Sequence, residues 1–418
     1  MSLFQRITGY WKRFQKWGFK GVYTFFVSKI KKAKRDRWIL SLSPKPYPKP
    51  IRGFTLAGSF SKTNSLSKVM RDLAYALNQV NIPYQILDLS EESNAISSKE
   101  LTAIATPRKD IHLCRYTHLL EMEDCPLPSD APVKRSRIYF WEFDTGLIEA
   151  SPSLLNCREL VGMSDFNCML FRKLFPQSIS VRKILYPFRA NITNLESPAI
   201  IRRRYKLCED DFVVFFNFDF TSSVDRKNPE GAIRAFARAF KDKPTAKLVF
   251  KTMNATMFPE RTQSIGQLAK SLDISDRFMT INDYIPTADL YGLTNACDVY
   301  LSLHRGEGFG LGIAEAMSLG KPVVVTDYSS TTEFCNRDNS ITIPYSVKPV
   351  PDNLSINPYY LFVKSWPEPD IDAAANALRL LYENEALRKK LGENARAFIA
   401  EHFSLENFKK SINHFLDN

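Results

Sequence analysis

The sequence contains no uninterrupted apolar run long enough to span a bilayer, which argues against a transmembrane helix. The N-terminus also lacks the short basic, apolar and small-residue order of a secretory signal. The seven cysteines have neither CxxC nor Cys/His spacing. We therefore expect reduced thiols in the cytoplasm, most of them small core residues, rather than a disulfide framework or a zinc site.

The chain has 418 residues, which is too long for one ordinary core and suits two domains. Apolar runs alternate with helical spacing, a pattern typical of two doubly wound α/β halves. We expect domain boundaries that give the segments 1–42, 43–200, 201–385 and 386–418. The runs that predict strands are 53–58, 84–89, 110–113, 136–141, 160–163 and 184–187, then 212–218, 247–251, 278–280, 299–302 and 322–326.

Positive charge is concentrated at the N-terminus. Residues 1–37 hold eleven Lys and Arg against one Asp, which is +10 of the chain's net charge of +12. The spacing of three and four between Phe4, Ile7, Trp11, Phe14 and Trp17 predicts an amphipathic helix with an aromatic face. Such a helix suits an anionic membrane surface. Packing of the aromatic face on the protein's own body is the alternative, and we do not expect nucleic-acid binding, because the body is near neutral.

A glycine-rich loop lies between the strand predicted at 299–302 and a predicted helix. Glycines occupy positions 306, 308, 310 and 312. Glycine lets backbone N–H groups approach a ligand, and a helix N-terminus adds unpaired donors and partial positive charge. This loop at the carboxyl edge of a sheet predicts a diphosphate site. A loop that only packs the helix on the sheet is the plain alternative.

Two glutamates flank this loop. Glu307 precedes the predicted helix, and Glu315 lies about one turn into it. Their carboxylates can accept hydrogen bonds from hydroxyls on either side of a bound diphosphate. A nucleotide sugar offers such hydroxyls, on the sugar at one side and on the ribose at the other. The pair therefore favours a nucleotide-sugar site over two solvated glutamates.

The spacing of Glu307 and Glu315, with the sequence that follows to Thr326, resembles the E-x7-E signature of retaining glycosyltransferases of the GT-B fold, family-4 type. The resemblance implies two facing Rossmann-like domains, an acceptor domain at 43–200 and a nucleotide-sugar donor domain at 201–385. It implies that Glu307 contacts the donor sugar and that Glu315 contacts the ribose. The residues whose backbone would hold phosphate are Gly308, Phe309, Gly310 and Leu311.

Upstream, Arg226 and Lys227 resemble the basic pair that this family uses to neutralise the departing diphosphate. An Arg fork and a Lys point charge suit negative charge that develops on a leaving phosphate. The two are adjacent here, whereas many members space them several residues apart, so which one reaches the phosphate is open. A solvated turn before the helix predicted at 229–240 is the alternative.

Three residues are candidates for the acceptor side. Gly58 stands where the family often has a glycine-rich acceptor loop, and Glu142 follows a predicted strand. His112, near the end of another predicted strand, is a candidate for the family's active-site histidine. A salt-bridged glutamate and a structural histidine are the competing interpretations.

The resemblance implies a retaining hexosyltransferase that uses a UDP- or GDP-linked sugar and a glycan or lipid-linked acceptor, as in bacterial surface polysaccharide synthesis. We expect peripheral association with the inner face of the membrane. No cofactor or metal is implied, because the only Asp-x-Asp, at 370–372, reads as helix-capping acids. A nucleotide-sugar epimerase, a phosphorylase of similar fold and a non-catalytic sugar- or lipid-binding protein are the alternatives.

Overall fold

The computed structural model describes residues 33–34, 36–37, 39, 47–62, 64–90, 111–123, 125, 131–188, 195–351 and 360–418. Most of the basic segment 1–37, with its predicted amphipathic helix, lies outside the described residues. Among the helices that are described, none is both long and apolar enough to cross a membrane.

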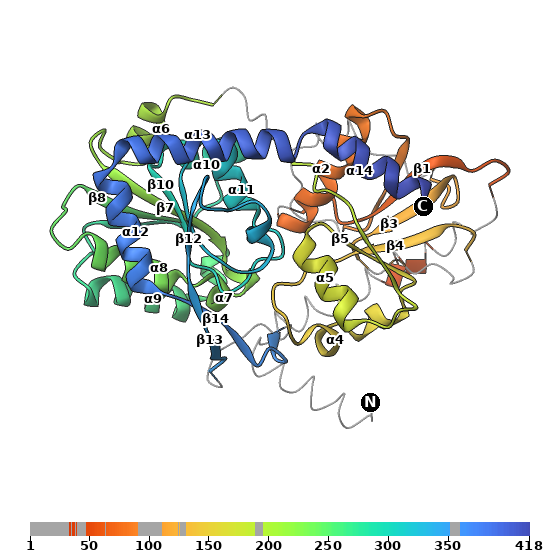
Figure 1. Cartoon of the computed structure of the whole chain (residues 1–418), viewed down its shortest axis with the longest axis horizontal. Coiled ribbons are helices and arrows are strands. Elements are labelled where there is room, and N and C mark those ends of the chain that lie inside the picture. The colour runs from red at the N-terminus through yellow and green to blue at the C-terminus, as the bar shows by residue number, and fades with distance from the viewer. Residues whose placement is uncertain are drawn as a thin grey trace. The chain divides into compact units, whose positions relative to one another are not determined.

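Two sheets of six strands each form the framework, and this confirms the predicted α/β class (Figure 1). The strand orders are β2-β1-β3-β4-β5-β6 and β12-β11-β10-β7-β8-β9. The first sheet contains β1 (Ile51–Gly58), β2 (Tyr84–Asp88), β3 (Tyr116–Glu121), β4 (Lys134–Ile138), β5 (Glu159–Gly162) and β6 (Ser180–Lys183). The second contains β7 (Phe212–Asp219), β8 (Ala246–Met253), β9 (Phe278–Ile281), β10 (Val299–Ser302), β11 (Val323–Thr326) and β12 (Ile341–Ile343).

Helices follow most of the strands, as parallel pairing requires. The helices of more than one turn are α2 (Ser65–Gln79), α5 (Asp165–Leu174), α6 (Pro198–Arg204), α8 (Pro229–Ala239), α9 (Pro259–Ser271), α10 (Thr287–Ala296), α11 (Leu311–Ser318), α12 (Ile371–Glu383), α13 (Glu385–His402) and α14 (Leu405–Asp417). The single turns are α4 (Leu147–Ala150) and α7 (Val224–Lys227). The 3-10 helices are η2 (Pro152–Asn156), η3 (Phe220–Ser222), η4 (Ala255–Met257) and η5 (Ser329–Glu333).

Several helix ends follow directly from the local sequence. Helix α2 begins after Asn64, whose side chain accepts a hydrogen bond from the backbone N–H of Ser67 and so caps the helix. Asp370 caps α12 in the same way, which confirms that this acid is a capping group. The apolar face of α12 packs against α8, where the figure shows both helices beside the second sheet (Figure 1).

The chain divides into two compact units, residues 1–138 with Asn418 and residues 139–417. Each unit has an apolar cluster of its own. In the first unit the cluster includes Ile39, Ala57, Leu87, Ile111, Leu113 and Leu119. In the second unit one cluster includes Trp141, Phe143, Leu160, Phe171, Val363 and Trp366. The predicted boundaries at 42/43, 200/201 and 385/386 stay a prediction.

An antiparallel ribbon interrupts the parallel pattern after β12. It consists of β13 (Tyr345–Pro349) and β14 (Ser365–Pro369), with Val347 opposite Pro367. Trp366 of β14 and Val363 just before it belong to the apolar cluster of Trp141 and Phe143. The ribbon is therefore fixed to residues that precede the second sheet in the chain.

Two predicted strands were wrong. Residues 111–115 form no strand, because the chain turns there and the strand β3 begins only at Tyr116. The run 184–187 also forms no strand, since β6 ends at Lys183. Ile111, Leu113, Ile184 and Tyr186 are buried, so the pattern correctly indicated burial at these positions and misidentified the backbone conformation.

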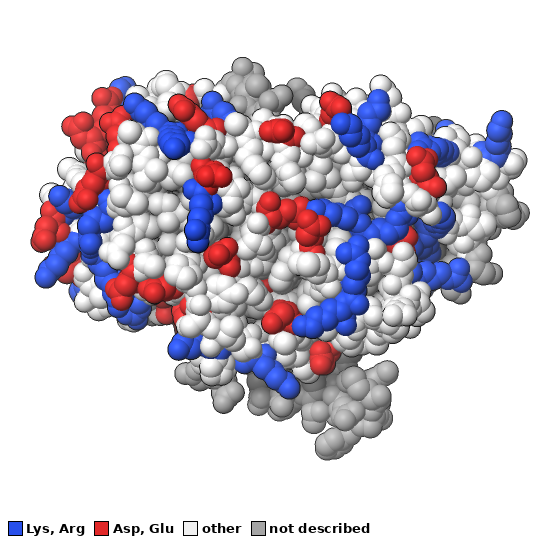
Figure 2. All heavy atoms as spheres, in the orientation of Figure 1, with Lys and Arg blue, Asp and Glu red and all other residues white. Residues whose placement is uncertain are grey.

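Charges are mixed over the face shown in Figure 2, where Lys and Arg side chains lie between Asp and Glu side chains. This pattern agrees with the near-neutral charge of the residues beyond position 37. The cysteines are free thiols, and all but Cys157 and Cys208 are buried, as expected of small core residues.

Candidate functional site

The glycine-rich loop connects β10 to α11, as the sequence predicted. Glu307 lies in this loop and Glu315 is the fifth residue of α11. Both side chains belong to buried residues, with exposed fractions of 7% and 8%. Buried carboxylates require partners, so these glutamates are not solvated surface groups.

Glu307 is paired with both members of the predicted basic pair. The Nζ atom of Lys227 donates to its Oε1 atom at 2.5 Å. The Nη1 atom of Arg226 lies 3.4 Å from its Oε2 atom. The structure therefore brings together three of the predicted catalytic residues, all buried or partly buried, from segments 80 residues apart.

Arg226 is also tied to main-chain oxygens and to a second carboxylate. Its Nη1 atom donates to the carbonyl of Gly306 at 2.6 Å, and its Nη2 atom donates to that of Ser222 at 3.0 Å. The Nη2 atom lies 3.8 Å from Oε1 of Glu142. Its buried Nε atom has no hydrogen-bond partner within the described part of the chain. Arg226 is thus held by several partners, whereas Lys227 forms an ion pair with Glu307 and is the more exposed of the two.

Arg226, Lys227, Glu307 and Glu142 form a cluster in which each charged group shifts the pKa values of the others. Burial opposes ionisation of Glu307, but Lys227 and Arg226 outweigh it and hold the pKa of Glu307 at about 2. Burial lowers the pKa of Lys227, and Glu307 opposes that shift. Burial raises the pKa of Glu142, against the pull of Arg226. Glu307 is therefore an anion at neutral pH and is held by two cations.

Glu142, the predicted acceptor-side carboxylate, is part of this cluster. It does not directly follow a strand as predicted, because β4 ends at Ile138. Its side chain is hydrogen-bonded by the hydroxyl of Tyr360. The ring of Tyr360 lies 5.6 Å from that of Trp141 and 5.3 Å from that of Phe143. These rings fix the Tyr360 hydroxyl against Glu142, and thus next to Arg226.

The glycines of the loop serve close packing within the protein. A Cβ atom on Gly306 would lie 2.6 Å from the carbonyl oxygen of Glu142. On Gly312 it would lie 2.5 Å from the hydroxyl of Tyr300, which donates to Asn217 at 2.6 Å. Gly310 has φ of +96°, the left-handed region that glycine adopts without strain. Packing accounts for these glycines, and close approach of a ligand to the loop stays a prediction.

Helix α11 presents the donors expected at a phosphate site. The N–H groups of Leu311 and Gly312 precede the first hydrogen bonds of the helix, which Ile313 and Ala314 donate to the carbonyl of Gly310. The ring of Phe309 packs among other rings, and its centre lies 4.6 Å from that of Tyr186 and 5.6 Å from that of Phe334. Only the backbone of Phe309 is therefore available to a ligand. Further along the helix, Glu315 accepts a hydrogen bond from Tyr291 at 3.2 Å.

Further polar side chains, those of Ser329 and Ser330, bind the backbone of the glycine-rich loop. The backbone N–H of Glu307 donates to Ser329 at 2.8 Å, and Ser330 donates to the carbonyl of Gly308 at 2.8 Å. His304 is fully buried, and its ring nitrogens lie 3.2 Å from the Ser302 hydroxyl and from the Tyr328 carbonyl. Burial lowers the pKa of His304 to about 4, so the ring is neutral at physiological pH.

The other two acceptor-side candidates lie in the first compact unit. Gly58 ends β1 at the carboxyl edge of the sheet, and a Cβ there would lie 3.2 Å from the side chain of Met70. His112 precedes β3, so it lies at the amino edge of the parallel strands and not at the strand end that was predicted. Its carbonyl accepts a hydrogen bond from Gln85 at 2.7 Å, and its ring lies against Tyr47. Because the two residues stand at opposite edges of one sheet, they do not form one site.

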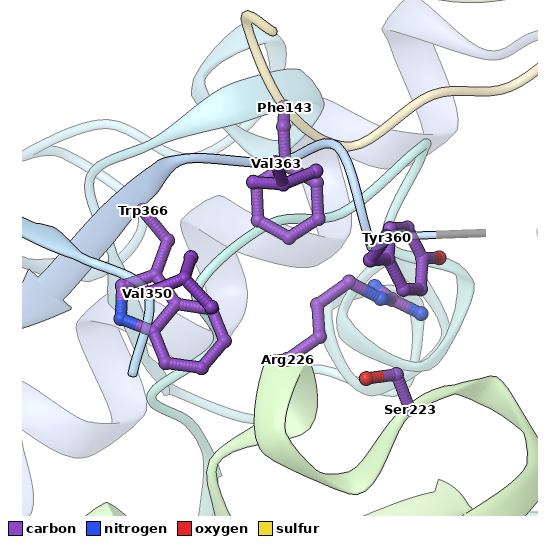
Figure 3. Close-up of a pocket in the computed structure, with 7 residues that line it drawn as sticks. All are labelled: Phe143, Ser223, Arg226, Val350, Tyr360, Val363 and Trp366. Carbon is purple, nitrogen blue, oxygen red and sulfur yellow. The ribbon is translucent and has the colours of Figure 1, made fainter. Parts of the chain in front are cut away.

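A narrow pocket opens beside Arg226 (Figure 3). The side chain of Arg226 extends along it toward Tyr360, and Ser223 lies below (Figure 3). Ser223 has φ of +66°, an unusual backbone conformation for a residue with a Cβ atom. The residues that line the pocket are Phe143, Ser223, Arg226, Val350, Tyr360, Val363 and Trp366.

Sequence reasoning missed Tyr360 and Arg305. Arg305 lies two residues before Glu307 and binds Glu368 of β14 through two hydrogen bonds of 2.7 Å. Arg305 directly precedes Gly306 of the glycine-rich loop, but its partner is 63 residues away in the sequence and no pattern connects the two. Within the described residues there is no group of three or more His, Cys, Asp or Glu side chains that could hold a metal ion.

Residues 202–348 match the model of a known protein family, the glycosyl transferases group 1. No curated protein matches the chain. The match covers β7 to β13 and so contains Arg226, Lys227, Glu307 and Glu315.

Solved structures share the fold at low sequence identity. HepE of Anabaena, solved in complex with UDP-glucose, is 14% identical with a TM-score of 0.65, over 88% of this chain and 100% of that one. Sucrose-phosphate synthase of Thermosynechococcus elongatus is 16% identical with a TM-score of 0.64, over 87% and 98%. WaaG, a glycosyltransferase involved in lipopolysaccharide biosynthesis, is 13% identical with a TM-score of 0.57, over 88% and 99%. These likenesses and the family match confirm the predicted resemblance to glycosyltransferases of the GT-B fold.

Proposed function

We propose, from the group 1 glycosyl transferase match of residues 202–348, that the chain is a retaining hexosyltransferase that uses a nucleotide-sugar donor. The observation that carries the proposal is the buried pairing of Lys227 with Glu307 beside the N-terminus of α11. This arrangement supplies a cation, a carboxylate and free N–H donors at one place. A nucleoside diphosphate sugar requires all three.

In this proposal the diphosphate lies between Lys227 and the first N–H groups of α11. Glu307 accepts a hydrogen bond from a donor-sugar hydroxyl, and Glu315 accepts one from the ribose. Lys227 suits the phosphate better than Arg226 does, because Arg226 is already bound to two carbonyl groups and is enclosed. Arg226 adds positive charge at short range in a site shielded from water, where charge acts strongly.

The reaction exchanges one bond of the anomeric carbon for another. The bond from that carbon to the diphosphate oxygen breaks, and a bond to the acceptor oxygen forms on the same face of the sugar. The acceptor proton leaves with the diphosphate, whose negative charge Lys227 and α11 stabilise. Positioning and charge stabilisation carry the step, so no metal or cofactor is part of the proposal.

The donor and the acceptor are proposed by class. HepE was solved with UDP-glucose, which supports a UDP-linked donor, with GDP-linked sugars as the second choice. The concentration of positive charge in residues 1–37 supports an anionic membrane surface as a partner. A glycan or lipid-linked acceptor in bacterial surface polysaccharide synthesis, handled at the cytoplasmic face, fits both observations.

Thermal unfolding with added nucleotides tests the proposal. A ligand at about one hundred times its Kd stabilises a folded protein by about 2.7 kcal/mol. We expect UDP or GDP, with its sugars, to raise Tm, and Glu315→Ala to weaken that rise. If no nucleotide raises Tm, the chain is a non-catalytic protein of this fold, and acceptor lipids are the next ligands to examine.

A further inference from the structure

We propose that Arg305 is a positioning residue for the diphosphate-binding cations, a role that rests on the proposed function. Arg305 lies in the loop before α11, and its side chain is directed away from Glu307 toward β14 and α7. It contacts no predicted substrate group. Its role is to fix the short segment that carries Arg226 and Lys227.

The segment that carries Arg226 and Lys227 is not a stable helix by itself. Helix α7 is a single turn, Val224–Lys227. An isolated turn is unstable, since it fixes several dihedral angles in return for one hydrogen bond. Residues with positive φ stand at both ends, Ser223 at +66° and Asn228 at +54°, which adds backbone strain. The position of Lys227 therefore depends on contacts from outside the turn.

Arg305 provides those contacts from its backbone and its side chain together. Its N–H donates to the carbonyl of Arg226 at 2.8 Å. Its Nη1 atom donates to the carbonyl of Asp225 at 2.6 Å. Two consecutive carbonyls of α7 are thus bound by one residue that is two positions from Glu307. The distance from Lys227 to Glu307 is set by this link.

The remaining donors of Arg305 anchor it to the ribbon. Its Nε and Nη2 atoms each donate to Glu368 at 2.7 Å, a bidentate pair. The guanidinium also lies over the ring of Trp366, 4.5 Å from the ring centre. The planar guanidinium binds the Glu368 carboxylate through two parallel hydrogen bonds and the Asp225 carbonyl through a third, a fixed geometry that a lysine ammonium group does not reproduce. Arg305 therefore connects the ribbon, α7 and the glycine-rich loop.

The test compares nucleoside diphosphates with monophosphates by isothermal titration calorimetry. UDP, UMP, GDP and GMP are titrated into the full chain, Arg305→Lys and a matched control, Arg238→Lys. Arg238 also pairs with an aspartate, at 2.7 Å, but on the surface, where its side chain is 52% exposed. We expect Arg305→Lys to bind the diphosphate about tenfold more weakly, from the loss of charge-assisted hydrogen bonds, and the monophosphate unchanged.

The ratio of diphosphate to monophosphate affinity separates positioning from general destabilisation. A variant that is merely less stable loses affinity for both nucleotides alike, and that result overturns the proposal, as does an unchanged ratio. If Arg305→Lys does not fold, Glu368→Gln takes its place, and an unchanged ratio there overturns the proposal. Failure of the unsubstituted chain to bind any of the four nucleotides instead overturns the proposed function.

Discussion

The Nζ atom of Lys227 lies 2.5 Å from the Oε1 atom of Glu307, although the two residues are 80 positions apart. Without a donor the carboxylate neutralises the cation that is proposed to hold phosphate. A bound diphosphate must therefore compete with Glu307 for Lys227, or share it. Removal of the Lys227 ammonium group therefore tests the proposed phosphate contact directly.

Lys227→Met is expected to weaken binding of UDP or GDP by about tenfold or more, because it removes a charge-assisted contact to phosphate. Tm is measured separately, because the substitution also removes one of the two cations paired with Glu307 and is expected to lower stability. Calorimetric titration and thermal unfolding measure the two effects. Lys389→Met, which removes an exposed lysine paired with Glu385, is the control. Unchanged nucleotide affinity would contradict the proposed diphosphate site.

Arg226→Met is expected to act mainly on stability. It leaves Glu142 and Glu307 with one fewer buried cation, and loss of one member of a buried ionic group costs about 3–5 kcal/mol. Chemical denaturation at pH 7 measures the change in the free energy of unfolding. A loss below about 1 kcal/mol would show that the surrounding carboxylates do not depend on Arg226.

His304→Gln is expected to flatten the dependence of stability on pH. The pKa of His304 is about 4 in the folded chain against an ordinary value of 6.5. As the pH falls, the unfolded chain is therefore protonated at this residue before the folded chain is. The contribution of this residue to the free energy of unfolding is fully present above pH 6.5. It falls toward pH 4 by up to about 1.4 kcal/mol per pH unit. Denaturation curves between pH 7 and 4.5 measure the slope. Equal slopes for the two proteins would contradict the buried neutral ring.

Tyr360→Phe is expected to lower Tm and leave nucleotide affinity unchanged. The variant removes the hydroxyl that is hydrogen-bonded to Glu142, and a bond to a charged group contributes about 1.5–3 kcal/mol. Tyr205→Phe removes a comparable bond, to Asp289, and serves as a matched control. A loss of nucleotide affinity specific to Tyr360→Phe would instead place its hydroxyl in the donor site.

Gly312→Ala is expected to disturb both folding and nucleotide binding. The added methyl group would meet the Tyr300 hydroxyl at 2.5 Å and Asn217 at 3.0 Å. Overpacking of this kind costs about 1–3 kcal/mol, and it displaces the start of α11. Thermal unfolding with and without UDP measures both effects. Gly266→Ala, where no atom lies within 4 Å, is the control and should have no such effect.

The sequence predicted those parts of the site that depend on neighbours along the chain. Glu307 and Glu315 were placed correctly around the start of α11 because strand, loop and helix follow one another there. Strand β10 has its predicted bounds, because its apolar residues form one short continuous run.

Contacts between distant segments could not be predicted. Nothing in the sequence links Arg305 to Glu368 or Tyr360 to Glu142, because only the folded chain brings them together. His112 was misplaced because the apolar residues around it, Ile111 and Leu113, are buried in a turn as they would be in a strand. The packing role of Gly306 and Gly312 depends on Glu142, Tyr300 and Asn217, which lie far from them in the sequence, whereas close approach of a ligand to the loop stays a prediction.

The ribbon that carries Trp366 has a consequence for the order in which the chain becomes functional during its synthesis. Trp366 and Val363 pack with Trp141 and Phe143, which a ribosome would release much earlier. A nascent chain halted at residue 350 already contains Lys227, Glu307 and Glu315 but has no Tyr360, Trp366 or Glu368. Such a chain has all the charged residues of the proposed donor site but none of the later residues that pack against them. Recognition of the donor would therefore mature only after the residues beyond position 350 have been made.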